Sequence, residues 1–168
     1  AVLGDDAVFI GDISQIVYTG SAMMTMDHPR RWFYPAGYGA LGGALPGAIG
    51  AKLALPEAPV IALAGDGGFM FTVQELMTAV ELKLPLPIII WNNDGFGMIR
   101  DGLEMSGIPR IAADPLNPDF IKLADAFGCA ASRPGDGDEF RAAITKALAT
   151  PGPTLIVVNQ GAGWLLPT

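Results

Sequence analysis

The segment VIALAGDGG (residues 60–68) joins an unbroken apolar run to a glycine-rich stretch that contains one aspartate. Comparable apolar runs occupy residues 7–10, 87–91 and 154–158, and a weaker one covers residues 129–132. Apolar runs that do not alternate with polar residues are typical of strands buried on both faces, as in a parallel sheet. The sequence therefore predicts a mainly parallel sheet.

Helical patterns lie between these runs, with apolar residues at steps of three and four. The predicted helices span residues 73–84 with Thr72 as N-cap, 120–127 before Gly128, and 140–148. Strands that alternate with helices favour an α/β fold with a doubly wound, mainly parallel sheet and helices on both faces. We expect a single domain over residues 1–168, excised from a longer chain because it begins at Ala1 rather than Met.

The composition excludes several classes of function. With 10 Lys and Arg against 17 Asp and Glu, the chain carries a formal charge of −7 and lacks the clustered cations that nucleic-acid binding needs. A single cysteine, Cys129, and a single histidine, His28, exclude an internal disulfide bond and a Cys/His zinc site. We expect Cys129 to be a buried, inert thiol. No apolar run reaches the roughly 18 residues that span a membrane, so we expect a cytoplasmic protein without nucleic-acid or membrane partners.

Polar residues with metal-binding chemistry follow two of the predicted strands. Ligands of open α/β sheets bind at the carboxyl ends of strands, where this sequence places a Gly65–Gly68 loop and an Asn92–Gly95 loop. Asp66, Asn93 and the backbone carbonyl of Gly95 offer hard oxygen ligands. Together they predict part of an octahedral Mg²⁺ site whose remaining positions suit diphosphate oxygens and water. Taken singly, each loop also suits an ordinary turn.

The order and spacing of these two motifs resemble a known cofactor signature. Gly-Asp-Gly, 24 residues (68–91) and then Asn-Asn resemble the signature of thiamine diphosphate (ThDP)-dependent enzymes. The segment GYGALGGALPGAIG (37–50) is similar to the one that grips the aminopyrimidine in acetolactate synthases and benzoylformate decarboxylases. Residues 7–15 resemble the opening of that family's C-terminal, diphosphate-binding domain. The resemblance implies that this chain is such a domain.

The resemblance also implies roles for individual residues. A backbone carbonyl at Gly39 would accept from the 4′-amino group of ThDP, and Leu41 would wedge under the cofactor and bend it into a V shape. Mg²⁺ would be held by Asp66, Asn93 and Gly95. The full predicted set of cofactor-binding residues is Gly39, Leu41, Gly65, Asp66, Gly67, Gly68, Asn93, Gly95, Phe96, Gly97 and Met98.

Half of the active site is expected to lie outside this chain. In the family that the chain resembles, the glutamate that protonates the pyrimidine ring belongs to a separate pyrimidine-binding domain, usually of another subunit. Nothing in these residues matches it, so we expect no catalytic residue here and no turnover by the chain alone. The implied assembly is a homodimer or homotetramer that acts on a small 2-oxo acid.

The segment after the asparagine pair bears on the type of enzyme. Acetolactate synthases carry Gln-Trp shortly after a similar Gly-Met-Val, whereas this sequence has Asp101-Gly102. The resemblance therefore favours a 2-oxo acid decarboxylase or an acetolactate synthase-like carboligase, and residues 91–102 are also similar to 5-guanidino-2-oxopentanoate decarboxylases. Met98 and Ile99 are candidates for the pocket wall, and Arg100 is expected to be a solvated or interdomain charge.

Two alternatives stay open at this point. GYGALG (37–42) is a literal G-x-G-x-x-G, which indicates an NAD(P)-binding domain of an oxidoreductase when it follows a buried strand. Residues 30–35 make a poor strand, and Glu57 lies before the next strand rather than at its end. The other alternative is a degenerate ThDP-type domain without catalysis, which the presence of Asp66 and Asn93 disfavours.

Overall fold

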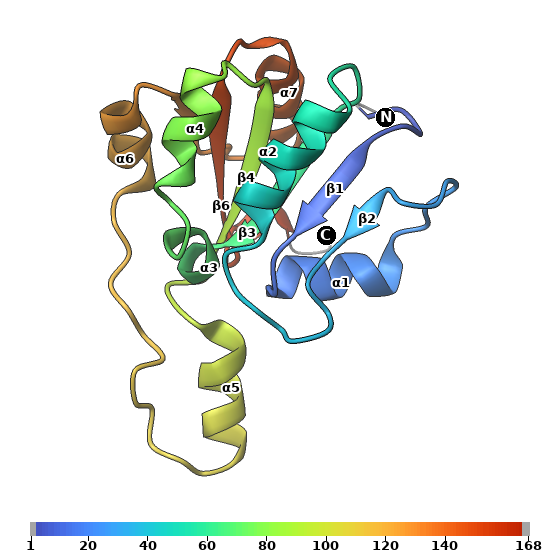
Figure 1. Ribbon diagram of the computed structural model, residues 1–168. Coiled ribbons are helices and arrows are strands. Elements are labelled where there is room, and N and C mark those ends of the chain that lie inside the picture. Colours follow the sequence, from blue (N-terminus) through green and yellow to red (C-terminus); the bar gives the residue numbers. More distant parts are fainter. Residues whose placement is uncertain (1–2, 166–168) are drawn as a thin grey trace.

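A six-stranded, entirely parallel sheet forms the centre of the domain in the computed structural model, which describes residues 3–165 (Figure 1). Its strands are β1 (Val8–Gly11), β2 (Trp32–Phe33), β3 (Val60–Gly65), β4 (Leu86–Asn92), β5 (Ala130–Ser132) and β6 (Pro153–Asn159). They lie in the order β2-β1-β3-β4-β6-β5. The predicted α/β fold with a parallel sheet is confirmed.

Helices cover both faces of this sheet. They are α1 (Gln15–Met23), α2 (Ala44–Ala54), α3 (Asp66–Met70), α4 (Glu75–Glu81), α5 (Gly97–Met105), α6 (Phe120–Phe127), α7 (Gly137–Ala149) and the 3₁₀ turn η1 (Gly163–Leu165). Helices α2, α4 and α6 pack on one face, and α1 and α7 on the other. Helix α5 projects beyond the carboxyl ends of the strands (Figure 1). Within residues 3–165, no helix has the length and apolarity to cross a membrane.

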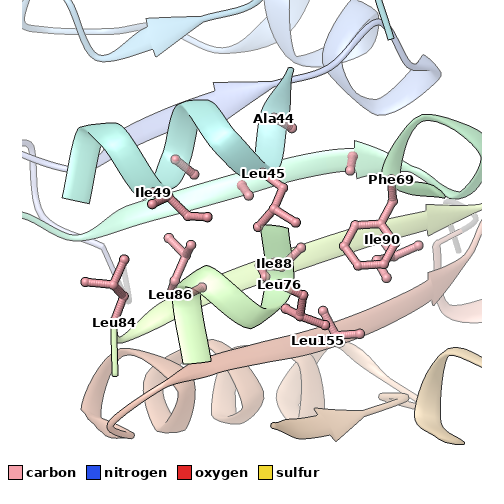
Figure 2. Close-up of a cluster of buried hydrophobic side chains, with 14 of the residues drawn as sticks. Ala44, Leu45, Ile49, Phe69, Leu76, Leu84, Leu86, Ile88, Ile90 and Leu155 are labelled. Atoms are coloured by element: carbon pink, nitrogen blue, oxygen red, sulfur yellow. The ribbon is translucent and has the colours of Figure 1, made fainter. Parts of the chain in front are cut away.

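The core explains why the central strands read as unbroken apolar runs. In β3, Val60, Ala62 and Ala64 belong to the cluster under α2, α4 and α6, while Ile61 and Leu63 belong to the cluster under α1 and α7. All five side chains are at most 5% exposed. Figure 2 shows the first cluster, in which side chains of α2 and α4 meet those of β4. Each large aliphatic side chain buried in this way stabilises the fold by about 1.5–3 kcal/mol.

The predicted helices at 120–127 and 140–148 are confirmed, whereas the one expected at 73–84 is shorter. It spans Glu75–Glu81, and Thr72 is not its N-cap. The Thr72 hydroxyl instead donates to the carbonyl oxygen of Gly42, 2.9 Å away. The Gly65–Gly68 segment was also predicted wrongly as a loop, because Asp66 opens the short helix α3. Glycine and aspartate have low helix propensities, so tertiary contacts rather than local sequence decide the conformation of this segment.

The G-x-G-x-x-G motif lies in an unsuitable place for a dinucleotide. It follows β2, a two-residue strand at the edge of the sheet in which Phe33 is 44% exposed. Glu57 precedes β3 and therefore lies at the amino end of that strand, away from the edge where ligands of such sheets bind.

The environment of Cys129 generates a prediction about its reactivity. The thiol, which was expected to be buried, is only half-buried just after α6, and this burial raises its pKa from 9.0 to about 11. Because only the thiolate reacts with disulfide reagents, we expect the folded chain to react roughly 100-fold more slowly at pH 8 than the urea-unfolded chain. A chromogenic disulfide reagent measures both rates. Equal rates in the folded and unfolded chain would contradict a raised pKa of the Cys129 thiol in the folded state.

Candidate functional site

The candidate site lies where the order of the strands reverses. From β1 the chain continues to β2 on one side, whereas from β3 it continues to β4 on the other, so the connections diverge and leave a crevice at the carboxyl ends. A cavity of about 290 Å³ occupies this position. All eleven residues that the sequence predicted for the cofactor line it, although they come from three separate connections, which follow β2, β3 and β4. The structure brings them together, and their role in binding stays a prediction.

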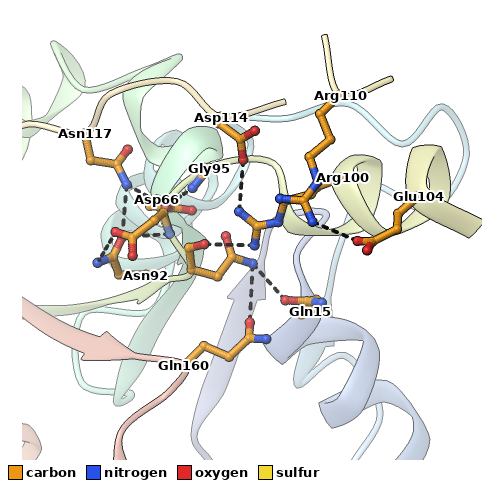
Figure 3. A network of polar contacts seen from close by, with 12 residues as sticks. Gln15, Asp66, Asn92, Gly95, Arg100, Glu104, Arg110, Asp114, Asn117 and Gln160 are labelled. Carbon is orange, nitrogen blue, oxygen red and sulfur yellow. Dashed lines mark hydrogen bonds and ion pairs between the residues drawn. The ribbon is translucent and has the colours of Figure 1, made fainter. Parts of the chain in front are cut away.

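Asp66 is the buried centre of this site. It follows β3 as the first residue of α3 and is 1% exposed. Its Oδ2 atom accepts from the backbone N–H of Gly95 at 2.8 Å and from the side-chain amide of Asn117 at 2.6 Å (Figure 3). Two donors therefore hold one carboxylate oxygen, and the other oxygen, Oδ1, faces Asn93.

The Asn93 side-chain amide, the carbonyl oxygen of Gly95 and Asp66 Oδ1 converge at this point. The side-chain oxygen of Asn93 lies 2.7 Å from the carbonyl oxygen of Gly95 and 3.3 Å from Asp66 Oδ1. The Asn93 amide nitrogen donates on its other side to Gln15 Oε1, 2.7 Å away, and lies 3.3 Å from Gln160 Oε1. If the amide is turned by 180°, its nitrogen donates to the Gly95 carbonyl oxygen and to Asp66 Oδ1. Its oxygen then lies against the side-chain oxygens of Gln15 and Gln160.

A cation between the three oxygens would satisfy them without this rotation. In an octahedral Mg²⁺ site with bonds of 2.0–2.1 Å, neighbouring ligand oxygens lie about 2.9 Å apart, which falls between the two separations around Asn93.

The backbone at Gly95 requires glycine. Its φ is +135°, a conformation in which only glycine is unstrained, and the added Cβ of any other residue would meet the carbonyl oxygen of Ala113.

The charge of this oxygen set indicates what else a cation would need. Among residues 3–165 there is no group of three or more His, Cys, Asp or Glu side chains that could hold a metal ion. The candidate site has one carboxylate, one amide and one carbonyl oxygen, so the protein supplies a single negative charge to a divalent ion. Mg²⁺ in such sites completes its coordination with substrate phosphates and water. The donor set therefore fits a metal bound together with a diphosphate.

Asp12, which the sequence analysis did not single out, supports the other wall of the cavity. It follows β1, is fully buried, and accepts from the backbone N–H groups of Ile13 at 2.9 Å and Gly42 at 2.8 Å. Together with the Thr72 hydroxyl, it fixes both polar backbone groups of Gly42 and so the segment that carries Gly39 and Leu41. The signal was present, because Asp12 follows a glycine at a strand end as Asp66 does.

Burial also changes the titration of this carboxyl group. Desolvation raises the pKa of Asp12 above its usual 3.8, against the opposing effect of its backbone hydrogen bonds. The folded protein therefore holds this proton more tightly than the unfolded chain does. The contribution of Asp12 to the free energy of unfolding falls as pH rises from below 3.8 through the pKa of the folded state.

Other polar residues of the site carried no recognisable sequence signal. The candidate metal-site residue Asn93 donates to Gln15 and Gln160, and Asp66 accepts from Asn117. These three partners come from segments far apart in the sequence. Arg100 was expected to be a solvated or interdomain charge. Its guanidinium is not free in solvent, because it pairs with Asp114 at 3.1 Å and donates to the carbonyl of Asn93 at 3.2 Å; an interdomain role stays a prediction. None of the five glutamates of the chain lines the cavity.

The contact between Asp12 and α3 gives a testable prediction. A Cβ added at Gly68 would collide with the Asp12 carboxylate. We expect Gly68→Ala to lower the free energy of unfolding by about 1–3 kcal/mol in urea titrations, as for other overpacked sites. The loss should shrink in an Asp12→Ala background, where the obstacle is removed. Gly102→Ala, at a position with open space, serves as the control. If Gly68→Ala lowers the free energy of unfolding equally in the wild-type and Asp12→Ala backgrounds, the close contact between Gly68 and Asp12 is contradicted.

The chain resembles known proteins along most of its length. Residues 12–158 match the family described as thiamine pyrophosphate enzyme, C-terminal TPP binding domain. The chain is 45% identical over 161 residues to the probable 2-ketoarginine decarboxylase AruI of Pseudomonas aeruginosa, an alignment that covers 95% of this chain and 29% of that protein. It is 33% identical over 145 residues to the acetolactate synthase isozyme 3 large subunit of Escherichia coli, covering 85% and 25% respectively.

A solved structure supports the same relationship. The thiamine diphosphate-dependent 4-hydroxybenzoylformate decarboxylase of Rhodococcus jostii matches with a TM-score of 0.84 and 32% identity, over 94% of this chain and 30% of that one. The chain thus spans less than a third of the length of these relatives. These matches decide against the NAD(P)-binding alternative. The chain belongs to the thiamine pyrophosphate (ThDP) enzyme family, as a C-terminal cofactor-binding domain related to decarboxylases and acetolactate synthases.

Proposed function

We propose that this domain binds ThDP together with Mg²⁺, and that it does so as part of a 2-oxo acid decarboxylase. The observation that carries the proposal is the convergence of the Asp66 carboxylate, the Asn93 side-chain amide and the Gly95 carbonyl at the cavity, each of which offers an oxygen ligand. A divalent cation would remove the repulsion among these oxygens, and a diphosphate would supply the negative charge that one carboxylate cannot.

The two walls of the cavity would hold the two ends of the cofactor. The metal-site residues would hold the diphosphate end through the cation. At the opposite wall, the carbonyl of Gly39 would accept from the aminopyrimidine, and Leu41 would press against the bent cofactor from below; both residues line the cavity. Asp12 and Thr72 keep this wall in place through Gly42. ThDP, when bound, supplies an electron sink for the loss of CO₂ from a 2-oxo acid.

Proton transfer to the pyrimidine ring would come from outside this chain. No glutamate lines the cavity, and the chain spans 29% of its 45% identical relative. We propose that a pyrimidine-binding domain, of the same or another subunit, covers the cavity in a cytoplasmic homodimer or homotetramer. The half-exposed side chains of Met98 and Ile99, which line the cavity, would then be covered and would form part of the substrate wall.

Replacing Asp66 tests the metal site directly. In Asp66→Asn, the amide oxygen can keep both hydrogen bonds to Gly95 and Asn117, while its nitrogen can donate toward the Asn93 oxygen. In Mg²⁺-free buffer, we therefore expect the urea concentration at the midpoint of unfolding to be the same as that of the wild type or higher. We also expect Mg²⁺-dependent ThDP affinity, measured by isothermal titration calorimetry, to fall by more than about 100-fold, because even outer partners of a metal ligand contribute 10–100-fold.

A matched control separates this effect from a general loss of negative charge. Asp125 is exposed on α6, and its side chain makes no hydrogen bond or ion pair within residues 3–165. Asp125→Asn should leave both ThDP affinity and its Mg²⁺ dependence unchanged. Tight, Mg²⁺-dependent ThDP binding by Asp66→Asn would contradict the assignment of the metal site.

The substrate is tested on the intact protein that contains this domain. The 45% identical relative is a probable 2-ketoarginine decarboxylase, and Asp101-Gly102 replaces the Gln-Trp of acetolactate synthases. From a panel of 2-ketoarginine, benzoylformate and pyruvate, we expect CO₂ release to be fastest with 2-ketoarginine and no acetolactate to form from pyruvate. The chain of residues 1–168 alone should release no CO₂. Acetolactate as the main product would contradict the decarboxylase assignment.

A further inference from the structure

The segment between α5 and α6, residues 106–119, is anchored at the candidate metal site. Much of it is exposed, with Ile108 50%, Ile111 72% and Leu116 100% exposed. Its fixed points lie next to the site: the carbonyl of Ala113 accepts from the backbone N–H of Phe96 at 2.9 Å, and Asp114 pairs with Arg100. Away from the site, Arg110 pairs with Glu104 of α5 at 2.8 Å. A further anchor at the site is Asn117.

Asn117 reaches the Asp66 carboxylate from 51 positions away in the sequence. Its amide nitrogen donates to Asp66 Oδ2 at 2.6 Å and to Asn92 Oδ1 at 3.0 Å (Figure 3). The two N–H groups of one amide thus bridge the side chain that follows β3 and the last side chain of β4. The bond to Asp66 falls on Oδ2, whereas the Asn93 side chain lies against the other carboxylate oxygen, Oδ1.

We propose that Asn117 is a positioning residue that aims the carboxylate of Asp66 at the cation. A carboxylate can rotate about its Cβ–Cγ bond, and the N–H of Gly95 alone holds Oδ2 from one direction only. The second donor, from Asn117, fixes the plane of the group, so that Oδ1 points toward Asn93 and the Gly95 carbonyl. Partners that orient a metal ligand in this way contribute measurably to metal affinity. This inference rests on the proposed Mg²⁺–ThDP function.

The experiment compares two kinds of variant in the intact protein. Asn117→Leu keeps the approximate volume of the side chain but removes both donors, and Asn117→Ala removes the side chain altogether. Asp114→Asn is the matched control, because it weakens another anchor of the same segment without touching Asp66. For each protein, isothermal titration calorimetry gives the Mg²⁺ concentration at which ThDP binding is half-maximal, and thermal unfolding without Mg²⁺ reports on the fold.

The expected result is a selective loss of metal affinity. Both Asn117 variants should need roughly 10–100-fold more Mg²⁺ than the wild type, with saturating Mg²⁺ restoring ThDP binding, whereas Asp114→Asn should match the wild type. Equal shifts in the Asn117 variants and Asp114→Asn would show that order of the segment, rather than the aim of Asp66, matters, and would overturn the proposal.

The remaining outcomes distinguish this inference from the proposed function. An unchanged Mg²⁺ requirement in both Asn117 variants would overturn the inference while leaving the metal site standing, provided that Asp66→Asn still abolishes Mg²⁺-dependent binding. If Asp66→Asn also binds normally, the metal site itself is wrong. If Asn117→Ala does not unfold cooperatively, the Mg²⁺ requirement of Asn117→Leu alone tests the inference, because the leucine side chain still fills the position.

Discussion

The buried carboxylate of Asp66 is the interaction around which the site is organised. Burying a charge is costly unless hydrogen bonds or an opposite charge compensate it. Here compensation comes partly from Gly95 and Asn117, which tie the connections after β4 and α5 to the end of β3. Its other oxygen, Oδ1, faces the Asn93 side-chain amide, which in turn lies against the Gly95 carbonyl oxygen. These groups form the site that we propose a cation completes.

A second buried carboxylate stabilises the neighbouring strand end in a different way. Asp12 follows β1 and Asp66 follows β3, and these two strands are adjacent at the point where the strand order reverses. Both backbone donors of Asp12 lie within the chain, so it serves as a structural clamp on Gly42 rather than as a ligand. Gly68 lies against it because a side chain would not fit there. The cavity is therefore held from both sides by buried acids with separate tasks.

The periphery of the site has a different character from the core. The strands and the sheet-facing sides of the helices bury their apolar side chains. Helix α5 and residues 106–119 lie beyond the sheet (Figure 1) and expose most of their large apolar side chains. Exposed apolar surface next to a ligand cavity is typical of a region that a partner covers. Asp114 and Asn117 anchor this region next to the candidate metal site, and an ion pair between Arg110 and Glu104 ties residues 106–119 to α5.

Local chemistry in the sequence was sufficient to determine the core strands, the α/β class and the residue types at two strand ends. Buried parallel strands must be apolar on both faces, and backbone that carries a ligand must be rich in glycine, so both features are written in short segments. Helices α1 and α2 escaped prediction because the glycine and polar residues of α1 and the nearly uniform apolarity of α2 blur the helical period. Helix α5 was missed although its apolar and polar residues follow a helical period. Only the tertiary structure decided the roles of Asp12, Thr72, Arg100 and Asn117. Their hydrogen-bond partners lie 7 to 51 residues away, and no spacing rule in the sequence encodes which distant donor meets which buried acceptor.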